Sequence, residues 1–519
     1  MKSTHLSLIA GTVALAAVTG FAALTAPGEG DAAEAKPASR LPVERSSLLC
    51  PAPSGSDLAD TLYTSFTPAG KGAAGAGTAE LKPSVPLVDD EADGDDAAAE
   101  KDPKKIKKAE EAAKKAKEKA EKPVVTVKEP GKPVTAEASG SDAPALVGTA
   151  HGRTAPGWTA QQTTTVAAGD ARGLLGVSCT APDTDFWFPA VSTAKSRQDY
   201  IHLTNPDDSA AVADIELYGP EGALKSDVGE GITVPPRSTV AMLVTTLTSE
   251  AADSVTAHVT TRTGRVGAVV GVADDKAGSD WLPAAADPKG TLVMPGIPAD
   301  ATSVQLVAFA PGEDDADVKV QLLGKTAAFA PAGNDTLHIK SGMTASVDLK
   351  DVTRGEPGSL RLTPVQSSRA TPIVAALRVV RGTGAKQEIA FIPATGPVGE
   401  RASVADNRAK GSTLSLSAPG ATAKVKVTAS AGSEGGEQVV KTYTVKGGTT
   451  LAVDPPVPSG LKGGYALTVE TESGGLVHAA RTLALPEGGV AMFTVQTLPD
   501  DRGTVVVPSA KQDLSVLSD

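Results

Sequence analysis

The chain has 519 residues, of which 3% are aromatic, and a formal net charge of −12 at pH 7. This length exceeds what one hydrophobic core supports and predicts about three to five domains. The negative charge argues against general nucleic-acid binding, which requires a basic surface. Because Ala, Gly, Pro, Thr and Val are abundant and aromatic residues are scarce, the composition favours short strands joined by turns over large helical cores.

The N-terminus carries a long apolar segment. Residues 6–26 contain no charge and follow Lys2, so residues 1–26 are predicted to be a transmembrane anchor with its N-terminus inside the cell. The segment has about 20 residues, as a spanning helix requires, whereas a signal-peptide core has about 7–15 residues. A signal peptide cleaved near "AEA" at 33–35 is the alternative. Both alternatives place the rest of the chain outside the cytoplasm.

A polar tether is predicted at residues 27–46, followed by a β domain at residues 47–185. A charged insertion at residues 89–123 interrupts this domain, with an acidic block before a lysine-rich block. Because Ile106 is the only large apolar residue of the lysine-rich block, the insertion has no apolar face and is predicted to be a solvated helix or a disordered segment. Contact between its lysines and anionic wall polymers or lipid is the alternative.

The two cysteines, Cys50 and Cys179, match no zinc-binding or CxxC spacing. In an exported chain they are predicted to form one disulfide, which would join the two halves of the first β domain across the insertion. The closed loop would be longer than about 100 residues, for which the chain-entropy model gives a stabilisation of about 4–5 kcal/mol.

The rest of the chain contains a threefold repeat of about 105 residues. Each copy has an alternating strand, and these strands are "VADIELYG" at 212–219, "VKVQLLG" at 318–324 and "AKVKVTA" at 423–429. Period-two alternation predicts one buried face and one exposed face. We therefore expect an all-β fold of tandem immunoglobulin-like β-sandwiches, with repeats at 186–297, 298–396 and 397–508 and a polar tail at 509–519.

Three consecutive aromatic residues, Phe186, Trp187 and Phe188, lie in the segment "DFWFPA". Similar segments recur as "WLPAA" at 281–285 and "FIPAT" at 391–395, which favours a core or a plug between repeats. The alternative is an aromatic platform for a sugar ring. The candidate glycan contacts are Trp158, Trp187 and Tyr200.

The chain resembles an actinobacterial, streptomycete-like family of secreted or membrane-anchored proteins of unknown function with repeated β-sandwich domains. The segments that carry the resemblance are "LLCP" (48–51), "SCTAPDTDFWF" (178–188), "IHLTNP" (201–206), "ITVPPRS" (232–238) and "DWLP" (280–283). The chain departs from the family pattern at 189–199, where "PAVSTAKSRQD" stands instead of a glycine-rich run. This departure counts against a ligand site in that loop. The resemblance implies an envelope protein and supplies no catalytic residues.

Sequence motifs give no sign of catalysis, of a bound cofactor or of a metal. The six histidines show neither HxxxH nor HExxH spacing, and the chain has no G-x-S-x-G elbow and no P-loop. Acidic turns at 182–185, 205–209 and 311–317 could supply calcium ligands, but aspartate is also an ordinary turn residue.

These observations predict a non-enzymatic, extracytoplasmic protein of the cell envelope, a membrane-tethered scaffold for protein docking or surface presentation. Its expected partners are envelope proteins or cell-wall glycan, together with the membrane through the N-terminal helix, and no nucleic acid. A carbohydrate-binding protein that recognises wall glycan or secreted polysaccharide is the alternative function.

Overall fold

The computed structural model describes residues 39–70, 75–84, 121–226 and 228–507. The predicted N-terminal anchor, most of the tether and of the charged insertion, and the polar tail lie outside these residues. In the part of the chain that is described, no helix is both long enough and apolar enough to cross a bilayer.

The predicted all-β fold is confirmed, and it is built from four β-sandwiches. The first (residues 45–178) contains β2 (Arg45–Cys50), β3 (Ala59–Phe66), β4 (Ala79–Pro83), β5 (Val125–Val127), β6 (Val134–Ser139), β7 (Leu146–His151), β8 (Thr159–Val166) and β9 (Gly173–Ser178). The second (residues 185–282) contains β10 (Asp185–Val191), β11 (Arg197–Thr204), β12 (Ala211–Gly219), β13 (Gly222–Ala223), β14 (Ile232–Val234), β15 (Thr239–Leu243), β16 (Val255–Thr263), β17 (Gly267–Asp274) and β18 (Gly278–Leu282).

The other two sandwiches follow directly along the chain. The third (residues 292–393) contains β19 (Leu292–Ile297), β20 (Ala301–Phe309), β21 (Ala316–Leu323), β22 (Ala328–Phe329), β23 (Thr336–Ile339), β24 (Thr344–Asp348), β25 (Gly358–Pro364), β26 (Val374–Arg381) and β27 (Glu388–Pro393). The fourth (residues 401–497) contains β28 (Arg401–Asn407), β29 (Ser412–Ala418), β30 (Ala423–Ala429), β31 (Gly435–Glu437), β32 (Val439–Val445), β33 (Thr449–Val453), β34 (Ser459–Lys462), β35 (Tyr465–Gly474), β36 (His478–Ala484) and β37 (Phe493–Thr497).

All four sandwiches have the same strand order, shown by the second one, whose sheets run β10-β16-β12 with β13 and β14, and β15-β11-β17-β18. The first β domain is therefore a fourth copy of the repeat, split by the charged insertion between β4 and β5. The predicted sandwiches are confirmed, but their order differs from the immunoglobulin arrangement, in which the first two strands share a sheet. The spacing of strand patterns in a sequence indicates the lengths of strands and turns. It does not indicate which strands lie next to each other in a sheet.

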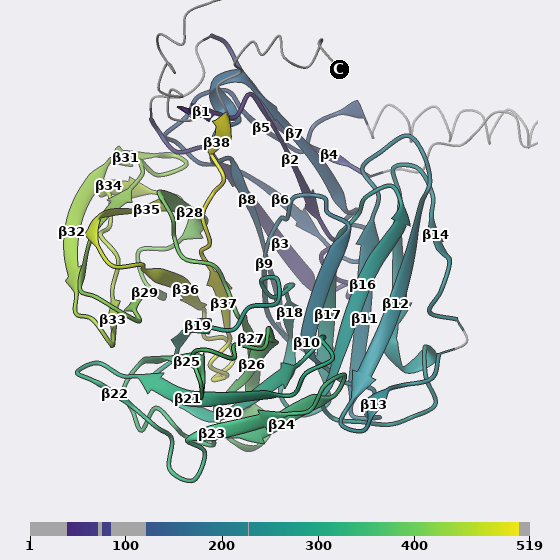
Figure 1. The fold of residues 1–519 in the computed structure, drawn as a ribbon. Coiled ribbons are helices and arrows are strands. Elements are labelled where there is room, and N and C mark those ends of the chain that lie inside the picture. Colours follow the sequence, from purple (N-terminus) through teal and green to yellow (C-terminus); the bar gives the residue numbers. More distant parts are fainter. Residues whose placement is uncertain (1–38, 71–74, 85–120, 227, 508–519) are drawn as a thin grey trace, which may run out of the picture. The chain divides into compact units, whose positions relative to one another are not determined.

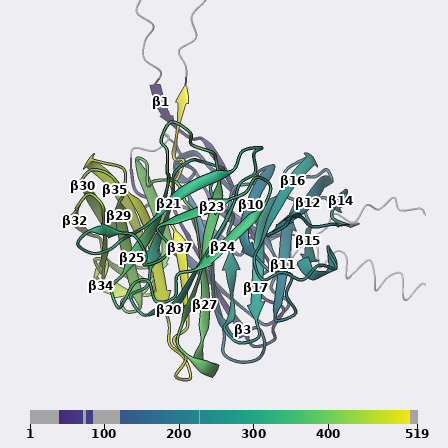
Figure 2. The same ribbon diagram turned by 60° about the horizontal axis from the view of Figure 1, so that its bottom comes forward.

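The last strand of each sandwich lies at the edge of its sheet and packs against two neighbouring sandwiches. β9 contacts β18 and β37, and β27 also contacts β18 and β37, so the four strands close into a ring (Figure 1). Figure 2 shows β27 and β37 side by side. The chain thus forms a closed arrangement within residues 42–503, which cluster as one compact unit.

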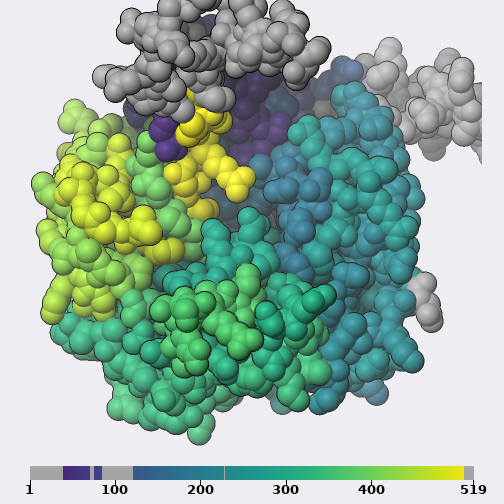
Figure 3. Space-filling model, in the orientation of Figure 1, coloured from purple at the N-terminus to yellow at the C-terminus, as the bar shows by residue number. Residues whose placement is uncertain are grey.

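Neighbouring sandwiches also share their hydrophobic cores. Ile389 and Phe391 of β27 lie in the core of the second sandwich, and Phe493 and Val495 of β37 lie in the core of the third. Each such side chain contributes about 1.5–3 kcal/mol when it is fully buried. A sandwich separated from its neighbour would expose these residues. In Figure 3 the surfaces of the second, third and fourth sandwiches are in contact.

The three aromatic segments do not occupy equivalent strands, although the sequence analysis treated them as one recurring element. "FWFPA" lies in β10, a first strand, whereas "WLPAA" and "FIPAT" begin in β18 and β27, which are last strands. The counterpart of β10 is β19, because Pro189 and Pro295 both precede a residue with positive φ, Ala190 (81°) or Gly296 (91°), and a shift in register. The predicted boundary at 297 therefore falls after the first strand of the third sandwich.

The remaining described residues form a separate small unit. There, β1 (Ser39–Pro42) pairs with β38 (Thr504–Val507) as a two-stranded sheet.

The described residues of the first three sandwiches also include short 3₁₀ turns that connect strands. These are η1 (Gly152–Thr154), η2 (Val244–Thr246) and η3 (Gly384–Lys386).

Candidate functional site

Buried polar side chains gather where the four last strands meet. Asp280 of β18 is 1% exposed, and its Oδ1 accepts hydrogen bonds from the Gly176 N–H of β9 (3.0 Å) and from Thr494 Oγ1 of β37 (3.1 Å). Its Oδ2 has no hydrogen-bond partner among the described residues. Burial raises the pKa of Asp280 well above its ordinary value. Three sandwiches therefore meet on one carboxyl group.

Arg172, in the turn between β8 and β9, links the first sandwich to the third. Its Nε donates to Glu388 Oε1 (3.0 Å), its Nη1 to the carbonyl of Ala385 (3.0 Å) and its Nη2 to the carbonyl of Gln387 (2.7 Å). The Glu388 side chain is fully buried, and this burial raises its pKa to about 7 although the Arg172 guanidinium opposes the shift. Among the described residues, the Arg172 guanidinium is the only cationic group in salt-bridge contact with this buried carboxylate.

A further set of buried polar side chains joins the first sandwich to the fourth. Gln161 Oε1 accepts from the backbone N–H groups of Ala405 (3.1 Å) and Asp406 (2.9 Å), and from Arg481 Nη2 (3.2 Å). Thr163 Oγ1 donates to Asp406 Oδ2 (2.8 Å). Arg481 is 0% exposed, and burial lowers its pKa to about 10. These bonds connect residues more than 240 positions apart and close the ring.

We expect Asp280→Asn to stabilise the protein at neutral pH by about 1–3 kcal/mol, because the amide retains the Oδ1 acceptor and lacks a carboxyl group whose ionisation favours the unfolded chain. The folded-state pKa of Asp280 lies above its ordinary value of 3.8, so above pH 3.8 the folded protein retains a proton that the unfolded chain releases. The carboxyl group therefore lowers stability progressively above pH 3.8.

The gain from Asp280→Asn should accordingly disappear in acid. Urea denaturation of the wild type and the variant across the pH range measures this difference. Asp253→Asn, a change of the same chemistry in an exposed loop of the second sandwich, is the control and should leave stability within about 0.5 kcal/mol at every pH. A variant less stable than the wild type at pH 7 would contradict the expected result.

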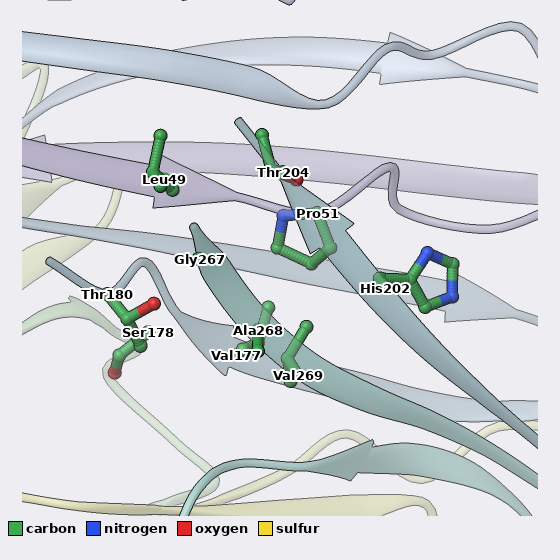
Figure 4. Close-up of a pocket in the computed structure, with 10 residues that line it drawn as sticks. All are labelled: Leu49, Pro51, Val177, Ser178, Thr180, His202, Thr204, Gly267, Ala268 and Val269. Atoms are coloured by element: carbon green, nitrogen blue, oxygen red, sulfur yellow. The ribbon is translucent and has the colours of Figure 1, made fainter. Parts of the chain in front are cut away.

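A shallow recess lies between the first and second sandwiches (Figure 4). It adjoins the disulfide, because Leu49 and Thr180 of its lining are sequence neighbours of the two cysteines. Cys50, at the end of β2, is bonded to Cys179, directly after β9, as the sequence predicts. The recess has a volume of about 10 Å³, which is about the room of one water molecule. No charged residue lines it, and its lining consists of Leu49, Pro51, Val177, Ser178, Thr180, His202, Thr204, Gly267, Ala268 and Val269.

Aromatic rings extend from this recess across the second sandwich. Tyr200 and His202 lie on the same face of β11, with ring centroids 6.4 Å apart, and His202 meets the Trp281 ring edge-on at 5.2 Å. Tyr200 is 37% exposed, whereas Trp281 is buried. Gly271, opposite Tyr200 in β17, lets Trp281 and His202 pack closely on the strand, since a Cβ there would lie only 3.1 Å from Trp281 and 3.3 Å from His202.

The other two candidate glycan contacts are inside the protein. Trp158 is 4% exposed and its Nε1 donates to Ser65 Oγ (2.8 Å). Trp187 is 8% exposed and stacks on His258 at 3.6 Å and on Phe309 at 5.5 Å. Because two rings already pack on Trp187, a sugar ring would have to displace one of them. Of the three candidates, Tyr200 alone offers an exposed ring.

The acidic turns are paired with basic side chains. Arg265 Nε donates to Asp207 (3.0 Å), Arg237 donates to Asp208, and His338 lies 2.8 Å from Asp317. Among the residues that the structure describes, no group of three or more potential ligands is arranged to hold a metal ion.

The model of a family of unknown function, DUF5719, matches residues 134–456, which is more than half of the chain. The chain belongs to DUF5719. The DUF5719 match begins at β6 and ends after β33, so it includes three of the four strands of the ring, β9, β18 and β27. No curated protein matches the chain.

Several residues of these sites were not predicted from the sequence. His202 and Asp280 both lie inside motifs quoted for the family resemblance, "IHLTNP" and "DWLP", but neither motif has a spacing typical of a known site. Arg172 and Glu388 are separated by 216 positions, and no local pattern connects them. Only the strand topology brings them together.

Proposed function

We propose that this DUF5719 protein is a non-enzymatic, extracytoplasmic scaffold of the cell envelope, held at the membrane by its N-terminal apolar segment. Its four sandwiches act as one rigid body and present sheet faces and loops to protein partners. The observation that carries this proposal is the closure of the ring between the first and fourth sandwiches through Gln161, Thr163 and Asp406.

Rigidity matters for a docking role because association costs less when the interacting surface is already ordered. A linear array of repeats would bend at each junction, whereas shared cores and buried polar bonds hold neighbouring sandwiches together. The disulfide supports the extracytoplasmic location, since such bonds persist in oxidising compartments.

Co-sedimentation of the purified full chain with isolated cell-envelope fragments tests this function. The fragments are used directly or after protease treatment that is quenched before the chain is added. We expect binding that falls strongly when the envelope proteins are digested. Binding that survives the digestion undiminished would replace the protein-docking role by glycan recognition, and an absence of binding to either preparation would refute the scaffold role at the envelope.

A further inference from the structure

The recess beside the disulfide and the adjoining side chains of Tyr200 and His202 have the composition of a ligand site. We propose that Tyr200, His202 and the adjoining recess bind an uncharged sugar ring of a glycan. This inference assigns a second binding activity to the molecule, beyond the protein-docking role.

The absence of charge at the recess favours a neutral ligand. None of the ten residues that line the recess carries a charge at neutral pH. Burial lowers the pKa of His202 to about 4, so its imidazole is neutral in this range. Neither ring nitrogen of His202 has a hydrogen-bond partner among the described residues, and a neutral imidazole offers one donor and one acceptor. This pair suits a hydroxyl group, which also donates and accepts.

The shape of the recess and of the adjoining Tyr200 ring fits a sugar. A water-sized recess beside an exposed aromatic ring accommodates one hydroxyl group while the apolar face of the sugar packs on Tyr200. The hydroxyls of Ser178, Thr180 and Thr204 lie around the recess and add polar atoms to an otherwise apolar lining (Figure 4). Few polar groups on an aromatic and aliphatic surface are typical of small-ligand sites.

The sheet that carries Tyr200 and His202 excludes an extended peptide that would pair with β11. Tyr200 and His202 lie on β11, which is hydrogen-bonded to β15 on one side and to β17 on the other. The backbone of β11 is therefore fully used within the sheet and cannot add a further strand. A sugar needs only side-chain contacts.

The test is a titration of the full chain with neutral tetrasaccharides, namely N-acetylglucosamine tetramer, cellotetraose and maltotetraose, at millimolar concentration. Saturation-transfer NMR detects binding. We expect saturable binding of at least one probe, an affinity loss of about two- to tenfold in Tyr200→Ala, and near-wild-type affinity in Tyr200→Phe, which keeps the ring. Phe329→Ala is the matched control, because Phe329 is an exposed aromatic residue (45%) of the third sandwich.

Three outcomes would overturn the proposal. They are the absence of saturable binding to all three probes, equal affinity of Tyr200→Ala and the wild type, and binding of anionic polygalacturonate in place of the neutral probes. Circular dichroism of each variant verifies that it is folded. Loss of sugar binding with retained, protease-sensitive envelope binding would remove this inference alone and leave the scaffold role intact.

Discussion

Removal of the Cys50–Cys179 disulfide is expected to lower the free energy of unfolding by about 4–5 kcal/mol. The bond closes a loop across 129 positions, and the chain-entropy model assigns a stabilisation of this size to such loops. It also fastens the first strand of the first sandwich to the end of its last strand, where Leu49 and Thr180 exchange two backbone hydrogen bonds. We expect the double variant Cys50→Ala/Cys179→Ala to show this loss in urea denaturation.

Reduction by dithiothreitol provides the control for that measurement. The reductant should lower the urea midpoint of the wild type and leave the midpoint of the double alanine variant unchanged. Equal midpoints for the oxidised wild type and the double variant would show that the disulfide contributes nothing to the stability of the first sandwich.

Arg172→Ala is expected to destabilise the protein by about 3 kcal/mol above pH 7, because it leaves the buried Glu388 carboxylate without its cationic partner. The pKa of Glu388 is raised from 4.5 to about 7, so between these values the folded state binds more protons than the unfolded state. Stability therefore falls as pH rises through this window. The defect of the variant should be smaller at pH 5, where Glu388 is protonated.

Two further variants isolate the ion pair. Arg172→Ala/Glu388→Gln should recover part of the lost stability at pH 8, since no buried charge remains unpaired. Arg153→Ala removes an exposed arginine of the same sandwich and should change stability by less than about 0.5 kcal/mol. A pH-independent defect in Arg172→Ala would show that packing, and not the charge of Glu388, accounts for the loss.

Local sequence patterns predicted the strands well where one face of the strand is exposed to solvent. In β12, Ile215 and Leu217 are buried while Glu216 is exposed, as the alternation indicated. β8 gave no such signal, because Gln161, Thr163 and their neighbours are buried although polar. Gln161 and Thr163 lie against the fourth sandwich, where Gln161 accepts a hydrogen bond from Ala405 and Thr163 donates one to Asp406. The first sandwich was therefore not recognised as a copy of the repeat.

The junctions between sandwiches were predicted only in part. The aromatic residues expected to plug the junctions do lie there, since Trp281 packs with Val177 of the first sandwich and Trp187 packs with Phe309 of the third. The closed ring was not predicted, because its decisive contacts join residues hundreds of positions apart. No sequence pattern around Asp280 indicates that three sandwiches meet at its carboxyl group.

Differential scanning calorimetry of the full chain tests most directly whether the four sandwiches form one body. Shared cores and buried polar seams predict a single cooperative transition for residues 42–503, with the calorimetric enthalpy equal to the van't Hoff enthalpy. Arg172→Ala should lower the temperature of that transition without dividing it. Two or more separate transitions in the wild type would mean that the sandwiches unfold independently, and this result would contradict the rigid scaffold.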